Sequence, residues 1–102
     1  MNFNKLRYVI VVAEERSITK AAKKLYISQP SLSQCIRSIE EDLGVDLFIR
    51  VKSSISLTQA GEAYIEWAKA TLESAKQLQS RLEKIKAGVT RQLDIRSPSF
   101  SN

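Results

Sequence analysis

Residues 17–44 read SITKAAKKLYISQPSLSQCIRSIEEDLG, and this stretch decides the fold. Ser17 and Ser28 are each positioned to cap a helix, because a serine hydroxyl accepts a hydrogen bond from a free N–H group of the first turn. Pro30 falls in the first turn of the second helix, where its missing N–H costs nothing. The sequence therefore predicts two short helices, with residues 26–27 as a tight turn between them.

Small side chains favour a close crossing of these two helices. Ala21 and Ala22 add almost no bulk to the inner side of the first helix, which they share with Ile18 and Leu25. In the second helix, one face carries an apolar stripe at steps of four and three, made of Leu32, Ile36, Ile39 and Leu43. This is the pattern of a helix-turn-helix, which places its second helix in the major groove of DNA.

The opposite face of the second helix is the candidate binding surface. A rotation of about 100° per residue puts Pro30, Gln34, Arg37 and Glu41 on it. Its N-terminal half is small, polar or basic, and the acids 40–42 lie in the C-terminal half. A helix that enters DNA by its N-terminal end favours this asymmetry, because its free N–H groups and positive dipole end attract phosphate.

One further element is expected before this pair of helices and one after it. Residues 3–15 carry apolar side chains at helical spacing, and we prefer a helix to a strand because no turn signal follows the β-branched run. The β-prone runs 47–50 and 55–57 predict a two-stranded hairpin. Such a hairpin forms a wing, in which Arg50 and Lys52 are available to phosphate or to the minor groove.

Thr58 is placed to cap a long helix that we expect to run to about residue 87 and to end at Gly88. Apolar and small residues recur along it at steps of three and four, which is a near-heptad seam. Its first half can pack on the small domain through Ala63 and Ala68, whereas its second half has no core left to cover. We therefore predict a partner helix. The predicted dimerisation residues are Tyr64, Trp67, Thr71, Ala75, Leu78, Leu82 and Ile85.

Composition excludes most other classes of protein. The chain has 102 residues and a net charge of +5, which suits a polyanionic partner. It has no histidine, one cysteine and three dispersed glycines, so we expect no metal site, no cofactor and no catalytic residue. Cys35 is interpreted as a small, partly buried residue rather than a redox switch. The lone cysteine and the absence of a long apolar run favour a cytoplasmic protein without a membrane partner.

The order and spacing of these motifs resemble the N-terminal region of LysR-type transcriptional regulators over residues 1–96, most specifically at 28–30 and 57–61. The resemblance implies a mainly α fold, a winged helix-turn-helix of three helices plus a two-stranded wing, followed by a linker helix. It also implies a homodimer through antiparallel linker helices, a dyad operator in double-stranded DNA, and a small-molecule effector bound only by a further C-terminal domain.

Carried over by position, the resemblance implies a set of DNA-contacting residues at the helix tip, along the helix and in the wing. They are Ser28, Gln29, Pro30, Ser31, Ser33, Gln34, Arg37, Arg50 and Lys52. Gln34 and Cys35 stand where the family usually has Arg then Gln, so a positive charge is lost, although Gln34 can bind adenine by two hydrogen bonds. The wing is also poorer in arginine than usual, with serines at 53, 54 and 56.

The sequence thus predicts residues 1–58 as a winged helix-turn-helix, 59–87 as a dimerisation helix, and 88–102 as a hinge and first strand of an effector domain, the strand being 93–96. The predicted function is sequence-specific binding of double-stranded DNA by a module of a LysR-type regulator. The alternative is a winged-helix module for protein interaction and dimerisation without specific DNA binding, its polar face simply solvated. The excess of basic over acidic residues in 1–58 argues against it.

Overall fold

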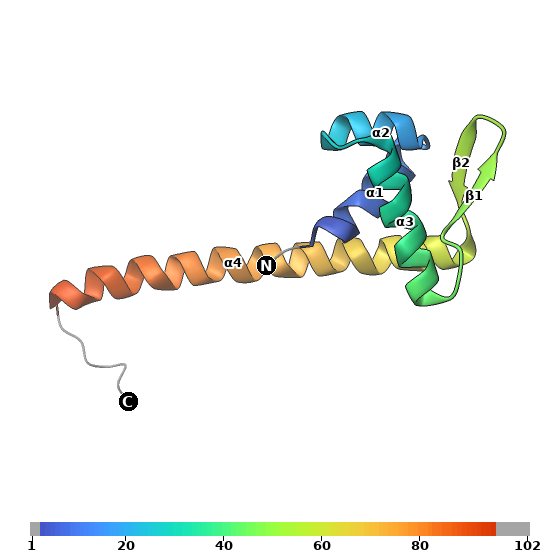
Figure 1. Ribbon diagram of the computed structural model, residues 1–102. Coiled ribbons are helices and arrows are strands. Elements are labelled where there is room, and N and C mark those ends of the chain that lie inside the picture. Colours follow the sequence, from blue (N-terminus) through green and yellow to red (C-terminus); the bar gives the residue numbers. More distant parts are fainter. Residues whose placement is uncertain (1–2, 96–102) are drawn as a thin grey trace. The chain divides into compact units, whose positions relative to one another are not determined.

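The computed structural model describes the backbone of residues 3–95 and the side chains of residues 3–89. Among these residues, 3–72 form one compact unit and 73–95 belong to a second. The elements, drawn in Figure 1, are α1 (Asn4–Glu15), α2 (Ile18–Leu25), α3 (Gln29–Leu43), β1 (Phe48–Val51), β2 (Ser54–Leu57) and α4 (Gln59–Ile95). The fold is mainly α with one two-stranded sheet, which confirms the predicted fold class.

Local capping chemistry begins and ends the helices of the first unit. Ser17, Ser28 and Thr58 each accept the backbone N–H of the residue three positions later, at 3.1, 3.2 and 2.9 Å. Tyr26 ends α2 and Gly44 ends α3, both in the left-handed conformation, with φ of 59° and 73°. The predicted caps and the tight turn after α2 are therefore confirmed.

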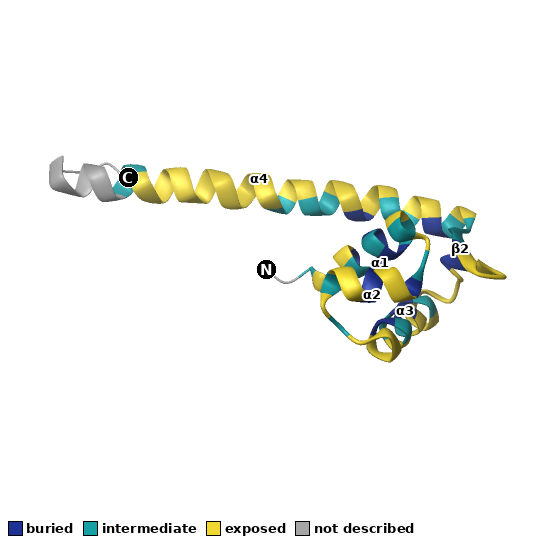
Figure 2. Ribbon diagram, turned by 90° about the horizontal axis from the view of Figure 1, so that it is seen from above, coloured by how far each residue is buried: buried dark blue, intermediate teal, exposed yellow. Residues whose placement is uncertain are grey.

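The main core lies where α1, α2 and α3 meet the base of the wing (Figure 2). Its buried residues are Val9, Val12, Ile18, Ala21, Ala22, Leu32, Ile36, Ile39, Leu47, Phe48 and Ile55. A smaller cluster of Leu6, Ile10 and Ala68 joins α1 to the early turns of α4. These contacts make α1 the central support on which both the helix-turn-helix and the start of α4 rest.

Two residues predicted to be in the core are exposed. Leu43, at the end of the apolar stripe of α3, is 50% exposed, because Leu47, at 1% exposure, fills the core beyond the helix end. Ala63 is exposed, whereas Ala68 is fully buried. Gly61 and Ala68 lie on one side of α4, and Ala63 follows Gly61 by about 200° of helical rotation, so it faces away from the domain.

The predicted wing is an antiparallel hairpin, shifted slightly along the sequence. Phe48 pairs with Leu57 and Val51 with Ser54, so the turn is the two residues 52–53. Lys52 takes the left-handed conformation that this turn needs, with φ of 51°. The N–H of Ile55 also donates to the Arg16 carbonyl at 3.3 Å, which ties β2 to the end of α1.

The prediction that the long helix ends at Gly88 was wrong, and so was the strand predicted after it. The helix α4 continues to Ile95, and Arg96 lies outside the described residues. A glycine inside a helix costs only about 1 kcal/mol relative to alanine, whereas a strand needs a neighbouring strand for its hydrogen bonds. The division of the chain at 58 and 87 stays a prediction.

Within residues 3–95, no helix is long and apolar enough to span a membrane.

Candidate nucleic-acid interface

The solvent face of α3 carries the residues predicted to read DNA. Exposed among them are Ser28, Gln29, Pro30, Ser31, Gln34 and Arg37, and Ser33 is half-buried. Ser28 is occupied by capping, since its hydroxyl accepts the Ser31 N–H at 3.2 Å and donates to the Ser31 hydroxyl at 2.8 Å. Ser28 therefore shapes the helix tip and fixes which way the following side chains point.

The longer polar side chains of this face make only weak contacts with one another. Gln29 Nε2 donates to Ser33 Oγ at 3.5 Å, and Arg37 Nη1 donates to Gln34 Oε1 at 3.4 Å. Both distances lie beyond the usual range for strong hydrogen bonds, and both contacts are exposed. These amide and guanidinium groups can exchange such contacts for bases or phosphates at little cost.

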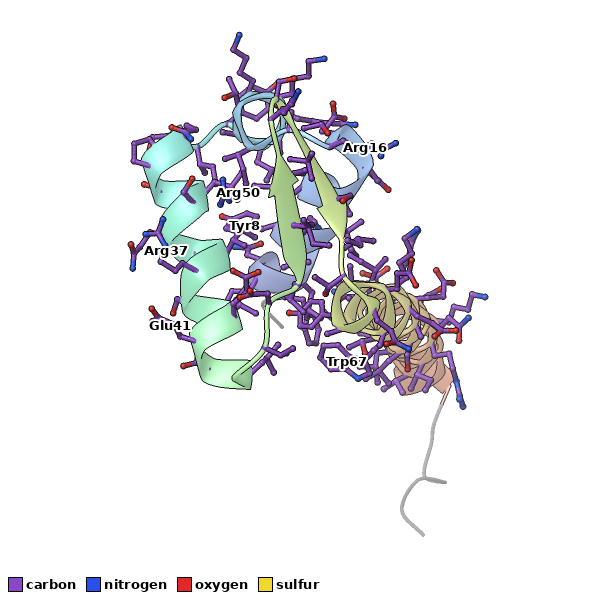
Figure 3. The ribbon with its side chains drawn as sticks, turned by 90° about the vertical axis from the view of Figure 1, so that its right-hand side faces the viewer. Tyr8, Arg16, Arg37, Glu41, Arg50 and Trp67 are labelled. Atoms are coloured by element: carbon purple, nitrogen blue, oxygen red, sulfur yellow. The ribbon has the colours of Figure 1, made fainter. Side chains whose placement is uncertain are left out.

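Charge is graded along α3. Its first turn contains no acid, and the acids of residues 40–42 lie toward its C-terminal end. Arg37 and Glu41 both project from the outer side of the helix (Figure 3). On the neighbouring helix α2, Lys20 and Lys23 are exposed, while Lys24 forms an ion pair with Glu15 at 3.1 Å. The N-terminal half of α3 is therefore the part that fits a polyanion.

The wing places its two predicted cations differently. Arg50 pairs with Ile55 in the hairpin and shares a face of β1 with Phe48, and both Ile55 and Phe48 are buried. Arg50 itself is exposed and lies between the wing and α3 (Figure 3). Lys52 is exposed in the hairpin turn. Arg50 is thus directed toward α3, and Lys52 sits at the tip.

The contacts of Glu40 go beyond the sequence prediction, which treats Glu40 only as an acid kept away from DNA. Glu40 is half-buried, and its Oε2 accepts the N–H groups of Leu47 and Phe48 at 2.7 and 3.1 Å. The one feature of the sequence that points to these contacts is the position of Glu40, four residues after Ile36 at the edge of the apolar stripe. A carboxylate at such an edge can reach the backbone N–H groups of the segment that packs there, as Glu40 does.

Cys35 is half-buried next to the core, as predicted. Burial raises the pKa of its thiol, and the nearby positive charge of Lys5 opposes that shift. A thiol with a raised pKa is mostly protonated near neutral pH and is a poor nucleophile. The thiol therefore behaves as part of the packing.

The predicted dimerisation residues differ in exposure along α4. Tyr64 packs against both core clusters, and burial raises the pKa of its hydroxyl. Its ring meets that of Trp67 edge-on, with 5.6 Å between centroids, and Trp67 is exposed. Thr71 and Ala75 are half-buried. Further along, three large apolar side chains are 46%, 52% and 55% exposed, namely Leu78, Leu82 and Ile85.

Comparisons with known proteins agree with this geometry. The family model of bacterial regulatory helix-turn-helix proteins of the lysR family matches residues 3–62. The Hca operon transcriptional activator HcaR of Escherichia coli (strain K12) is 45% identical over 85 residues, which cover 83% of this chain and 29% of that protein. The HTH-type transcriptional regulator ClcR of Pseudomonas putida is 47% identical over 72 residues, which cover 71% of this chain and 24% of that protein. The chain thus spans less than a third of the length of these curated relatives.

Solved structures with this fold include two DNA complexes. The BenM DNA-binding domain with catB site 1 DNA has a TM-score of 0.81 and 39% identity, covering 86% of this chain and 95% of that one. The CbnR DNA-binding domain with DNA has a TM-score of 0.79 and 40% identity, and the match covers 84% of this chain and 99% of that one. The chain belongs to the lysR family of bacterial regulatory helix-turn-helix proteins.

Proposed function

We propose that this chain is the operator-recognition module of a LysR-type transcriptional regulator and binds double-stranded DNA sequence-specifically. The observation that carries the proposal is the exposed, acid-free N-terminal half of α3 beside a wing with exposed Arg50 and Lys52. The DNA complexes of the BenM and CbnR domains, which share this fold at 39% and 40% identity, support it.

Affinity and specificity then come from different groups. Phosphate contacts by Arg37, Arg50 and Lys52 supply salt-dependent affinity, because each releases counterions from the DNA. Base reading falls to the N-terminal half of α3, where the amides of Gln29 and Gln34 can pair with adenine in the major groove. The positive end of the α3 dipole adds to phosphate binding.

The substitution Gln29→Ala tests base reading. It should weaken binding to the specific dyad by about 1–3 kcal/mol and binding to scrambled DNA hardly at all. The dyad is obtained by selection from random double-stranded DNA, and both duplexes are titrated by fluorescence anisotropy across a salt series. Gln77→Ala is the matched control, because it removes an exposed glutamine side chain that belongs to α4 and not to α3.

Three outcomes of this titration decide between functions. Wild-type binding that is tighter to the dyad than to scrambled DNA, and that Gln29→Ala weakens by about 1–3 kcal/mol on the dyad alone, supports the proposal. Equal losses on both duplexes contradict the base-reading role of Gln29. Wild-type protein that binds neither duplex at low salt contradicts DNA binding altogether and favours the protein-interaction module.

We also propose that the chain forms a homodimer through α4. The supporting observation is the exposed row of Leu78, Leu82 and Ile85, three large apolar side chains at steps of four and three on one helical face. Exposed apolar rows of this kind are typical of interfaces, and a second α4 presents the same row.

Leu82→Asp should shift the chain toward monomer, raising the dimer dissociation constant at least tenfold, since a buried unpaired carboxylate is costly. The control is Ser80→Asp, which introduces the same charge about 160° around the helix from Leu82. Sedimentation velocity over a range of protein concentrations measures both. A Leu82→Asp protein as dimeric as Ser80→Asp would contradict the proposed interface.

A further inference from the structure

The chain between α3 and β1 is held by a side chain of α3. Glu40 Oε2 accepts the backbone N–H groups of Leu47 and Phe48 at 2.7 and 3.1 Å. Both residues are buried, at 1% and 7% exposure, and both hydrogen bonds are partly buried. A buried N–H without a partner is costly, and an ionised acceptor makes a stronger bond than a neutral one. The Glu40 carboxylate therefore satisfies the two donors at the entry to the wing.

The same segment is held from its other side by the residues that begin α4. The Leu47 carbonyl accepts the Thr58 N–H at 3.0 Å, and the Thr58 hydroxyl donates to the Asp46 carbonyl at 2.7 Å. Residues 46–48 are thus fixed between Glu40 and Thr58. Residues 44 and 45, which precede it, and Asp46 itself are exposed, so the connection from α3 to the wing contributes no core residue before Leu47.

This arrangement links the two elements proposed to touch DNA. Phe48 is the first residue of β1, and Arg50 follows two positions later on the same face of the strand. Glu40 belongs to the helix that carries Gln29 and Arg37. Its two hydrogen bonds consequently connect the strand bearing Arg50 to the helix that reads bases.

We infer that Glu40 is a positioning residue for DNA binding, whose carboxylate holds the wing so that Arg50 and the tip of α3 engage one duplex together. The inference rests on the proposed DNA binding. The neighbouring Glu41 carries the same charge on the same helix, but it is exposed and projects from the outer side of α3 (Figure 3). Glu41 therefore allows the effect of the Glu40 hydrogen bonds to be distinguished from the effect of its charge.

A double-mutant cycle between Glu40→Ala and Arg50→Ala tests this coupling in the whole chain, with the selected dyad duplex as the probe. In the wild type, Arg50→Ala should weaken binding about tenfold, since a phosphate or minor-groove contact is lost. In the Glu40→Ala background the same change should weaken it less than about twofold, because Arg50 no longer reaches the DNA reliably. Glu40→Ala alone should weaken binding although it removes a negative charge.

Two further variants distinguish positioning from electrostatics. Glu41→Ala removes the same charge from the same helix and should leave the cost of Arg50→Ala unchanged. Glu40→Gln keeps an acceptor oxygen at the same reach and should retain most of the coupling. If urea titration shows that Glu40→Ala is unfolded at the assay temperature, Glu40→Asp replaces it, because its shorter side chain keeps the charge without reaching both N–H groups.

Each result decides the inference. Equal costs of Arg50→Ala with and without Glu40, or no cost in the wild type, overturn the positioning role while leaving DNA binding in place. Coupling lost equally in Glu41→Ala overturns it in favour of a general charge effect. A wild-type chain that binds no DNA overturns the proposed function and this inference together.

Discussion

Gly61→Ala should lower the free energy of unfolding by about 3 kcal/mol or more, although alanine is the better helix former by about 1 kcal/mol. A Cβ at this position would overlap the Leu47 carbonyl oxygen and lie 2.7 Å from Leu57 Cδ2 and 3.0 Å from the Leu47 carbonyl carbon. The carbonyl cannot retreat easily, because it accepts the Thr58 N–H. The steric cost therefore exceeds the gain in helix propensity.

Gly88→Ala is the matched control for this substitution. A Cβ at Gly88 would meet nothing within 4 Å, so only the helix propensity changes, and the free energy of unfolding should rise by up to about 1 kcal/mol. Urea unfolding followed by circular dichroism, at one protein concentration, compares the two variants with the wild type. Two alanine variants of equal stability would contradict the close approach of α4 to Leu47.

Leu32→Ala should lower the free energy of unfolding by about 3 kcal/mol, within the range measured for leucine deletions in protein cores. Leu32 is fully buried among the residues that join α2, α3 and the wing. The substitution removes three carbon atoms and leaves a cavity that the surrounding helices, fixed by their caps and short turns, can fill only in part.

Leu43→Ala makes the same chemical change at the other end of the same apolar stripe. Because Leu43 is half-exposed, its loss should cost less than about 1 kcal/mol. Thermal or urea unfolding of the two variants measures the difference directly. Similar losses for both would mean that the stripe of α3 is buried along its whole length, as its spacing alone predicts.

Two glycines illustrate where sequence signals become ambiguous. Gly44 ends α3 in the left-handed conformation, and the next N–H, that of Val45, reaches back to the Glu40 carbonyl at 3.2 Å. The sequence predicts the same role for Gly88, yet α4 continues through it to Ile95. A glycine permits a helix end without requiring one, so the packing of the next residues along the chain decides whether the helix ends there.

By itself, the sequence determined the features that depend on residues a few positions apart. The capping serines, Pro30, the turn at Tyr26 and the acid-free start of α3 all follow from local backbone chemistry, and the motif spacing identified the family. Only the tertiary structure decided that Leu47 rather than Leu43 fills the core, that Gly61 meets Leu47, and that Glu40 holds the wing. These depend on how helices cross and where strands enter, and helical or strand periodicity fixes the face of a residue but not the neighbour that it meets.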